Sequence, residues 1–176
     1  MKKLIGMVLA ISMLVIFAVG CVPKTPEVVN VDIKEVHTAI KEALGEDYRA
    51  DRDLEAEELE GIVKVKAEDM EEYIAQAPMI SVGVDTFIAI KAKEGKADAI
   101  EEGLNNHRKY LVEDSMQYPM NIAKINASKV IRHGDYIFFL LLGKYDDREQ
   151  ATEEEYLEFA KDEVQKVEEI VNGFFK

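Results

Sequence analysis

Apolar positions along the chain form one long run at the start and shorter periodic segments after it. Only Gly6 and Ser12 interrupt the run between Leu4 and Val19, and small residues then lead to Cys21. Later segments repeat apolar residues every three or four positions, as amphipathic helices do, or gather them in short β-rich runs, as strands do. The pattern predicts an N-terminal apolar segment followed by one folded domain.

Two helices are predicted early in this domain. The apolar stripe of residues 32–44 starts at Asp32 and Glu35, which have capping-box spacing, and Gly45 can end the helix. Residues 68–77 also carry apolar side chains at helical spacing, up to Pro78.

The acidic stretch between these two helices, residues 46–66, has no single period. Leu54, Leu59 and Ile62 suit a short helix, whereas residues 63–66 alternate between valine and lysine as a strand would. Both interpretations stay open for this stretch.

The second half of the domain has clearer helical signals. Residues 96–113 place an apolar stripe that includes His107 on one face, and residues 122–125 suit a short helical piece after Pro119. Thr152 and Glu155 have capping-box spacing and open a long apolar stripe, which predicts a C-terminal helix ending near residue 173.

Residues 86–91 and 137–142 are predicted strands, and the second is an unbroken apolar run without alternation. A strand of this kind is covered on both faces. His133-Gly134 supplies the tight turn of a hairpin that ends in this run. The predicted fold class is therefore α+β, with an antiparallel sheet of three or four strands, helices packed on it, and the long C-terminal helix covering the second face.

The N-terminal run has the organisation of a secretion signal: a basic start with Lys2 and Lys3, an apolar stretch, and small residues where cleavage would occur. Ala18-Val19-Gly20-Cys21 resembles the bacterial lipobox, although leucine is more usual where Ala18 stands. In a lipobox the cysteine sulfur receives a diacylglycerol and cleavage makes the cysteine the first residue. We expect residues 1–20 to be a lipoprotein signal peptide and Cys21 to be lipidated; the alternative is an uncleaved signal anchor.

Residues 21–31 are interpreted as the lipidated cysteine and a tether, followed by a single domain over residues 32–176. Pro23 and Pro26 favour extended backbone in the tether. Ten residues span at most about 33 Å. We therefore expect the domain to lie close to the outer face of the cell membrane, anchored by acyl chains such as palmitate.

The charge of the chain limits its partners. The formal net charge is −13, and it becomes −15 once Lys2 and Lys3 leave with the signal peptide. Nucleic acid and anionic polymers are repelled by such a domain unless it is locally basic. Cys21 is the only cysteine, so its acylation leaves no thiol and disulfides are excluded.

The middle of the chain resembles a family of lipoproteins from Gram-positive bacteria that is known only as a domain of unknown function. The resemblance rests on "MEEYIAQAPMISVGVDTFIAIKAKEGKADAIEEGL", Arg108, Pro119 and "GDYIFFLL", and it covers roughly residues 32–145. These elements are structural, and none is a reactive motif. The resemblance implies a fold and an extracytoplasmic location, and it implies no activity.

Candidate chemistry is sparse. His37, His107 and His133 are scattered, and His107 is interpreted as a packed core histidine. The acidic stretch 51–61 has alternating carboxylates but lacks the glycine and glutamate of a calcium loop, so we interpret it as a solvated acidic face. No catalytic residue, metal ligand or cofactor is predicted.

Two classes of function fit this sequence. The first is a lipid-anchored extracytoplasmic module that binds an envelope protein or a small ligand. The second is a cell-envelope enzyme whose catalytic groups come together only in the fold. The first is preferred because no reactive constellation supports the second.

Overall fold

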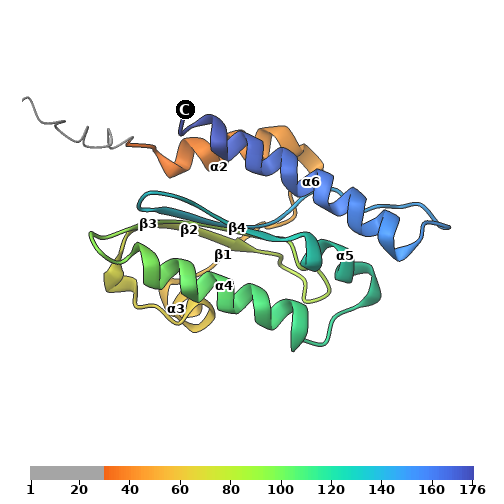
Figure 1. Cartoon of the computed structure of the whole chain (residues 1–176), viewed down its shortest axis with the longest axis horizontal. Helices are drawn as coiled ribbons and strands as arrows, with labels where there is room; N and C mark the ends of the chain where they lie inside the picture. Colours follow the sequence, from red (N-terminus) through yellow and green to blue (C-terminus); the bar gives the residue numbers. More distant parts are fainter. Residues whose placement is uncertain (1–29) are drawn as a thin grey trace, which may run out of the picture. The chain divides into compact units, whose positions relative to one another are not determined.

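An antiparallel sheet of five strands, in the order β1-β2-β3-β5-β4, forms the middle layer of the structure (Figure 1). The strands are β1 (Arg52–Asp53), β2 (Met70–Ala77), β3 (Thr86–Ala92), β4 (Lys129–His133) and β5 (Tyr136–Leu141). The α+β class and the antiparallel sheet are as predicted. The strands number five rather than three or four, because the sequence pattern does not reveal β1 and β2.

This computed structural model describes residues 30–176, of which Val31–Lys176 form one compact unit. The predicted signal peptide, the predicted lipidation site Cys21 and the predicted tether up to residue 29 lie outside the described residues. Among residues 30–176, every helix is too short or too polar to cross a membrane.

Helices cover both faces of the sheet. Helices α2 (Ile33–Leu44) and α6 (Glu153–Gly173) lie on one face, and α3 (Ala56–Val63) and α4 (Ala97–Glu113) lie on the other (Figure 1). Helix α5 (Pro119–Ala127) contacts α4, α6 and β5. Two short 3₁₀ turns, Gly45–Asp47 and Ala67–Asp69, follow α2 and precede β2.

Each face of the central strands has its own hydrophobic core. Phe87, Phe138 and Leu140 pack under α2 and α6, and Ile88 and Phe139 pack against α3 and α4. The unbroken apolar run of β5 is thus covered on both sides, and the C-terminal helix covers one of them, as predicted. Both cores are built from residues 31–176, so this compact unit carries its own hydrophobic cores.

The chain enters the domain beside the β4–β5 hairpin. Val31 is buried, and its N–H donates to the Tyr136 hydroxyl at 3.1 Å. Asp32 then caps α2 by accepting from the Lys34 N–H at 2.8 Å, so it acts as a simple N-cap and not in the predicted reciprocal pair with Glu35.

Strand β2 corrects the prediction of a helix over residues 68–77. It pairs along its length with β3, and the register shifts between Met70 and Glu72. Such a bulge adds a residue to one strand, so Met70 and Tyr73 reach the same core although three positions separate them. The bulge therefore gives the apolar residues of this strand the spacing along the sequence that is typical of a helix.

The ambiguous acidic stretch contains both kinds of element. Its helix is α3, and its strand is the two-residue β1 rather than residues 63–66. Lys64 follows α3 with a left-handed φ of 57°, which ends the helix and breaks the strand-like alternation. The predicted strand over 63–66 is therefore wrong.

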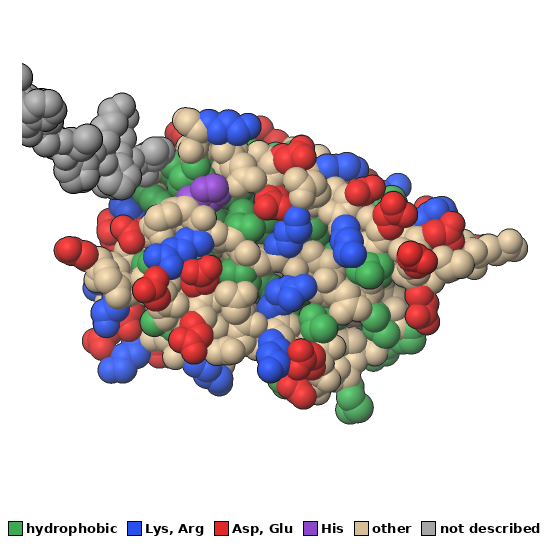
Figure 2. All heavy atoms as spheres, viewed as in Figure 1, with side chains coloured by type: hydrophobic (Ala, Val, Ile, Leu, Met, Phe, Trp, Pro, Cys, Tyr) green, Lys and Arg blue, Asp and Glu red, His purple; other side chains and the backbone are tan. Residues whose placement is uncertain are grey.

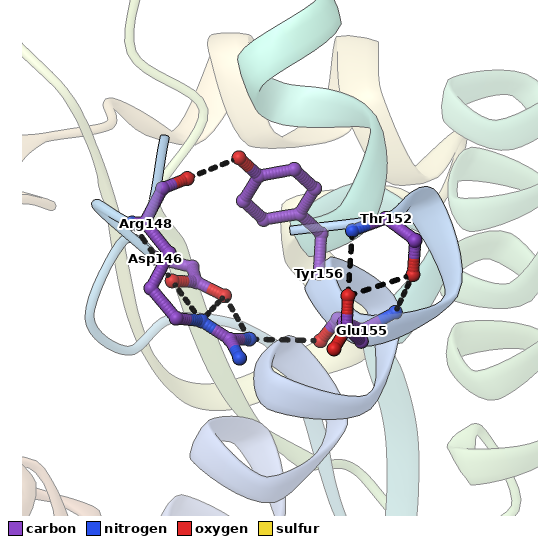
Figure 3. A network of polar contacts seen from close by, with 5 residues as sticks. All are labelled: Asp146, Arg148, Thr152, Glu155 and Tyr156. Carbon is purple, nitrogen blue, oxygen red and sulfur yellow. Dashed lines mark hydrogen bonds and ion pairs between the residues drawn. The ribbon is translucent and has the colours of Figure 1, made fainter. Parts of the chain in front are cut away.

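The long C-terminal helix begins at the predicted capping box (Figure 3). Thr152 Oγ1 accepts from the Glu155 N–H at 3.3 Å, and Glu155 Oε2 accepts from the Thr152 N–H at 2.7 Å. The Tyr156 hydroxyl donates to the carbonyl oxygen of Arg148, whose guanidinium pairs with Asp146 (Figure 3). These contacts hold the preceding loop against the start of α6.

Candidate functional site

Exposed apolar side chains gather at one end of the domain. All nine large hydrophobic residues that are exposed among residues 30–176 belong to the loop before β3 or to the stretch from the end of α4 into α5. We call this set the apolar end surface: Met79, Ile80, Val82, Tyr110, Val112, Met116, Tyr118, Met120 and Ile122. Figure 2 shows hydrophobic side chains gathered at the lower right, over the end of α4 and over α5.

Single exposed hydrophobic residues are normal on protein surfaces, but a contiguous group marks an interaction site. Met116 is 101% exposed and Met79 is 72% exposed. The Asn121 side chain on α5 donates to the carbonyl oxygen of Val82 at 2.9 Å, so the two segments of the surface are joined.

Hydrogen bonds hold the loop of this surface in place. Pro78 ends β2, the Met79 N–H donates to Asp51 Oδ1 at 3.0 Å, and the Gly83 N–H donates to the Ile80 carbonyl at 3.1 Å. A Cβ on Gly83 would lie 3.0 Å from the Pro78 Cβ, so a larger residue in this turn would require Pro78 to move by a few tenths of an ångström. The apolar side chains are thus presented by a fixed loop.

The second segment is shaped by the end of α4 and the start of α5. The Ser115 hydroxyl donates to the Leu111 carbonyl at 2.7 Å and accepts from Gln117 at 2.9 Å. Pro119 occupies the first turn of α5, where its missing N–H costs nothing and its fixed φ suits the helix. The short connection therefore leaves Met116 and Tyr118 exposed.

A buried ion pair lies under this surface. Lys124 Nζ is 2.6 Å from Asp85 Oδ1 and donates to the Gly143 carbonyl at 2.7 Å. The Tyr145 hydroxyl is 3.2 Å from Asp85 Oδ2 and 3.1 Å from Asn121 Oδ1. The cluster ties α5, the residue before β3 and the loop after β5 together.

Burial sets the electrostatics of this cluster. Burial raises the pKa of Asp85 and lowers that of Lys124, while the attraction between the two opposes both shifts. Burial and the Asp85 carboxylate also raise the pKa of the Tyr145 phenol. Both carboxylate oxygens and the ammonium group have partners inside the protein, so the cluster is arranged as a clamp rather than as groups open to a substrate.

The three histidines lie apart. His107 is a packed residue, as predicted: its ring meets Phe139 edge-on at 5.6 Å, and burial lowers its pKa to about 4. His37 Nε2 lies 2.9 Å from Gln76 Oε1, and burial lowers its pKa. His133 stacks on Phe175. Within the described part of the chain, no group of three His, Cys, Asp or Glu side chains could hold a metal ion.

The acidic stretch 51–61 is built into β1 and α3. Asp51 accepts from Met79, and Asp53 Oδ1 accepts from the Gln76 amide at 2.6 Å. Glu58 pairs with Arg52 at 3.0 Å and forms a capping box with Glu55. These carboxylates have structural roles at separate places.

Arg108, which contributed to the family resemblance, has a structural role. Its guanidinium donates to the carbonyls of Ser128 at 2.6 Å and Asn126 at 3.1 Å, at the end of α5. It thereby satisfies carbonyls that the helix end leaves open. A shallow depression of about 420 Å³ lies beside it, against Lys161 and Gln165 of α6.

Sequence reasoning missed the four residues of the clamp, Asp85, Asn121, Lys124 and Tyr145. A lysine inside the apolar stretch "NIAKINA" was the available signal, because a lysine is buried only with a partner. Its partner Asp85 is 39 positions away, and no local pattern connects the two.

The fold and its surface define a class of small three-layer α+β domains with an exposed apolar end. Residues 45–142 match the family model "Domain of unknown function (DUF4358)". The match spans more than half of the chain, and the protein belongs to this family. It covers β1 to β5 with α3, α4 and α5, and it leaves out α2 and α6. No curated protein and no solved structure matches the chain.

Proposed function

We propose that the protein is a lipid-anchored extracytoplasmic interaction module that binds a partner through the apolar end surface. The observation that carries the proposal is the gathering of all nine exposed large hydrophobic residues of the described chain on two neighbouring segments. Burying such residues against a partner removes apolar area from water, which is the main driving force of association.

The entry point of the chain supports this function. Val31 contacts Tyr136 at the start of β5, whereas the apolar end surface lies beyond the other end of the central strands, where β3 begins. The six residues of β5 separate the two ends by about 17 Å. A domain held to the membrane through residues before Val31 can therefore turn the apolar end surface toward a partner.

The proposal is tested in two parts. Mass spectrometry of the protein extracted from membranes should find residues 1–20 absent and a diacylglycerol on Cys21. An intact Met1 or a free Cys21 thiol would contradict the anchor.

For the interaction, a photo-crosslinking amino acid is placed in cells at residue 116, in the connection after α4, or, as a control, at exposed residue 102 of α4. We expect a discrete protein adduct from position 116 that the control does not give. Adducts with lipid alone, or equal adducts from both positions, would contradict the proposed interaction function.

A further inference from the structure

We propose that the partner of the apolar end surface is a protein segment that presents lysine or arginine beside apolar side chains. This inference rests on the proposed interaction function and names the chemistry of its partner.

The surface itself has the composition of an interface core. Charged residues make up 32% of the chain, yet residues 78–84 and 115–123 contain none. Interface cores are depleted in charge and enriched in methionine and tyrosine. Met79, Met116 and Met120 have flexible side chains that can adapt to an apolar partner.

The edge of the surface is negative at the end of α4. Glu113 is the last residue of this 17-residue helix and Asp114 follows it, and the last turn contains no basic residue. The Tyr110 carbonyl accepts from the N–H groups of Asp114 and Ser115 at this end. Lys109 reaches Glu113 only at 3.8 Å, in an exposed pair.

This arrangement is unfavourable in the free protein. The C-terminal end of a helix carries a partial negative charge, which favours nearby cations and disfavours carboxylates. A cation supplied by a partner would offset the carboxylates of Glu113 and Asp114 and the helix end together. Because Met116 and Val112 lie next to these residues in the chain, the same segment would bury apolar side chains beside its cation.

Other occupants fit less well. A second copy of this chain would bring two domains of the same strongly negative charge together and place Glu113 and Asp114 near their equals. A bilayer with anionic lipids is repelled for the same reason. The negative edge therefore selects a basic protein segment.

The experiment uses the unlipidated chain from residue 22, which retains the whole packed unit 31–176. Two synthetic helical peptides share one leucine face and differ in the polar face, which is lysine in one and glutamate in the other. Binding is followed by amide chemical shifts in NMR titrations. We expect the lysine peptide to bind and to shift amides within residues 78–84 and 110–122.

Variants separate the apolar contribution from the charge. Met116→Ser should weaken binding of the lysine peptide about tenfold, since it removes one buried side chain from the complex. Asp114→Asn should weaken it about threefold at low salt. Glu102→Gln is the matched control: it removes the same charge from an exposed position of α4, about 18 Å away along the helix axis, and should change nothing.

The outcomes test the proposed chemistry of the partner separately from the proposed interaction function. If both peptides bind this surface equally, or if Asp114→Asn has no effect, the partner chemistry is wrong and the interaction function stands. If neither peptide binds, or if shifts spread over the acidic surface elsewhere, both are overturned. Concentration-dependent dimers that Met116→Ser abolishes, or binding to phosphatidylcholine vesicles through residue 116, would assign the surface to a second copy or to lipid instead.

Discussion

Lys124 Nζ lies 2.6 Å from Asp85 Oδ1, with side chains only 4% and 1% exposed. The ammonium group also stands 3.8 Å from the centre of the Tyr145 ring. This pair joins α5 to the start of β3 and so fixes the two segments that carry the apolar end surface.

Removing one partner of this pair should destabilise the protein strongly. Lys124→Met leaves the Asp85 carboxylate buried without its counter-charge, which costs roughly 3–5 kcal/mol. Urea unfolding measures the loss. Adding Asp85→Asn to Lys124→Met should restore much of the stability. Lys66→Met is the control, because Lys66 pairs with Glu68 at an exposed site, and its unfolding midpoint should stay nearly unchanged. Equal losses in both single variants would contradict a special role for the buried pair.

Gly103 allows α4 to approach the backbone of α3. A Cβ at this position would stand only 2.0 Å from the Val63 carbonyl oxygen. Gly103→Ala should therefore push the helices apart and lower the free energy of unfolding by roughly 1–3 kcal/mol. Gly61→Ala lies at an exposed position of α3 with open space around it and should raise stability by roughly 0.5–1 kcal/mol. Thermal unfolding of the two variants gives the comparison, and the same sign for both would count against close packing at Gly103.

Much of the fold follows from local sequence signals. The capping box at Thr152 and the glycine at residue 134 place α6 and the β4–β5 hairpin, because caps and turns are formed by neighbouring residues. Strand β2 could not be predicted this way. Its bulge puts Met70 and Tyr73 on one face, and only pairing with β3 reveals the strand.

The candidate site was even less visible in the sequence. Met116, Met120 and Ile122 resemble core residues, since apolar side chains at helical spacing are usually buried. Their exposure depends on tertiary packing, including the contact of Lys124 in α5 with Asp85, 39 positions earlier. Such a contact depends on tertiary structure, which no periodicity encodes.

His107 predicts an acid-sensitive part of the stability. Its pKa of about 4 in the fold lies below the ordinary value of 6.5, because burial disfavours the charged ring. As the pH falls, the unfolded chain takes up this proton first. The stability that comes from the lowered pKa of His107 is therefore fully present above pH 6.5. It is lost as the pH falls toward 4, and the loss in the free energy of unfolding reaches up to roughly 3 kcal/mol.

His107→Leu keeps an apolar contact with Phe139 and removes the titrating ring. The difference in unfolding free energy between the wild type and this variant should change between pH 7 and pH 4, with the variant losing less. Carboxylates titrate in both proteins and cancel in the difference. A difference that is constant with pH would disprove the role of His107.

The apolar end surface should be the first part of the domain to react with peroxide. The four methionines of the described chain divide sharply: Met79, Met116 and Met120 are 64–101% exposed, and Met70 is 6% exposed. Hydrogen peroxide converts an accessible thioether to the sulfoxide and is itself reduced to water. Mass mapping of peptides should show oxidation at the three exposed positions well before Met70. In urea-unfolded protein all four should react alike, and early oxidation of Met70 in the folded protein would contradict this burial.

Helix α6 should be required for a soluble fold, although it lies outside the matched family region. Val164, Val167 and Val171 are buried against the sheet face that carries Phe138 and Leu140. Deleting residues 152–176 would uncover this face, and we expect aggregation in size-exclusion chromatography.

A point substitution tests the same contact without removing the helix. Val167→Asp places a carboxylate in the core and should cost roughly 3 kcal/mol or more, because the charge has no partner there. Lys161→Asp introduces the same side chain at an exposed position of α6 and should leave the core intact. Urea unfolding compares the two. A deleted chain that stays soluble and unfolds cooperatively, together with a Val167→Asp variant as stable as Lys161→Asp, would show that α6 is dispensable for the fold and is free to serve as an interaction arm.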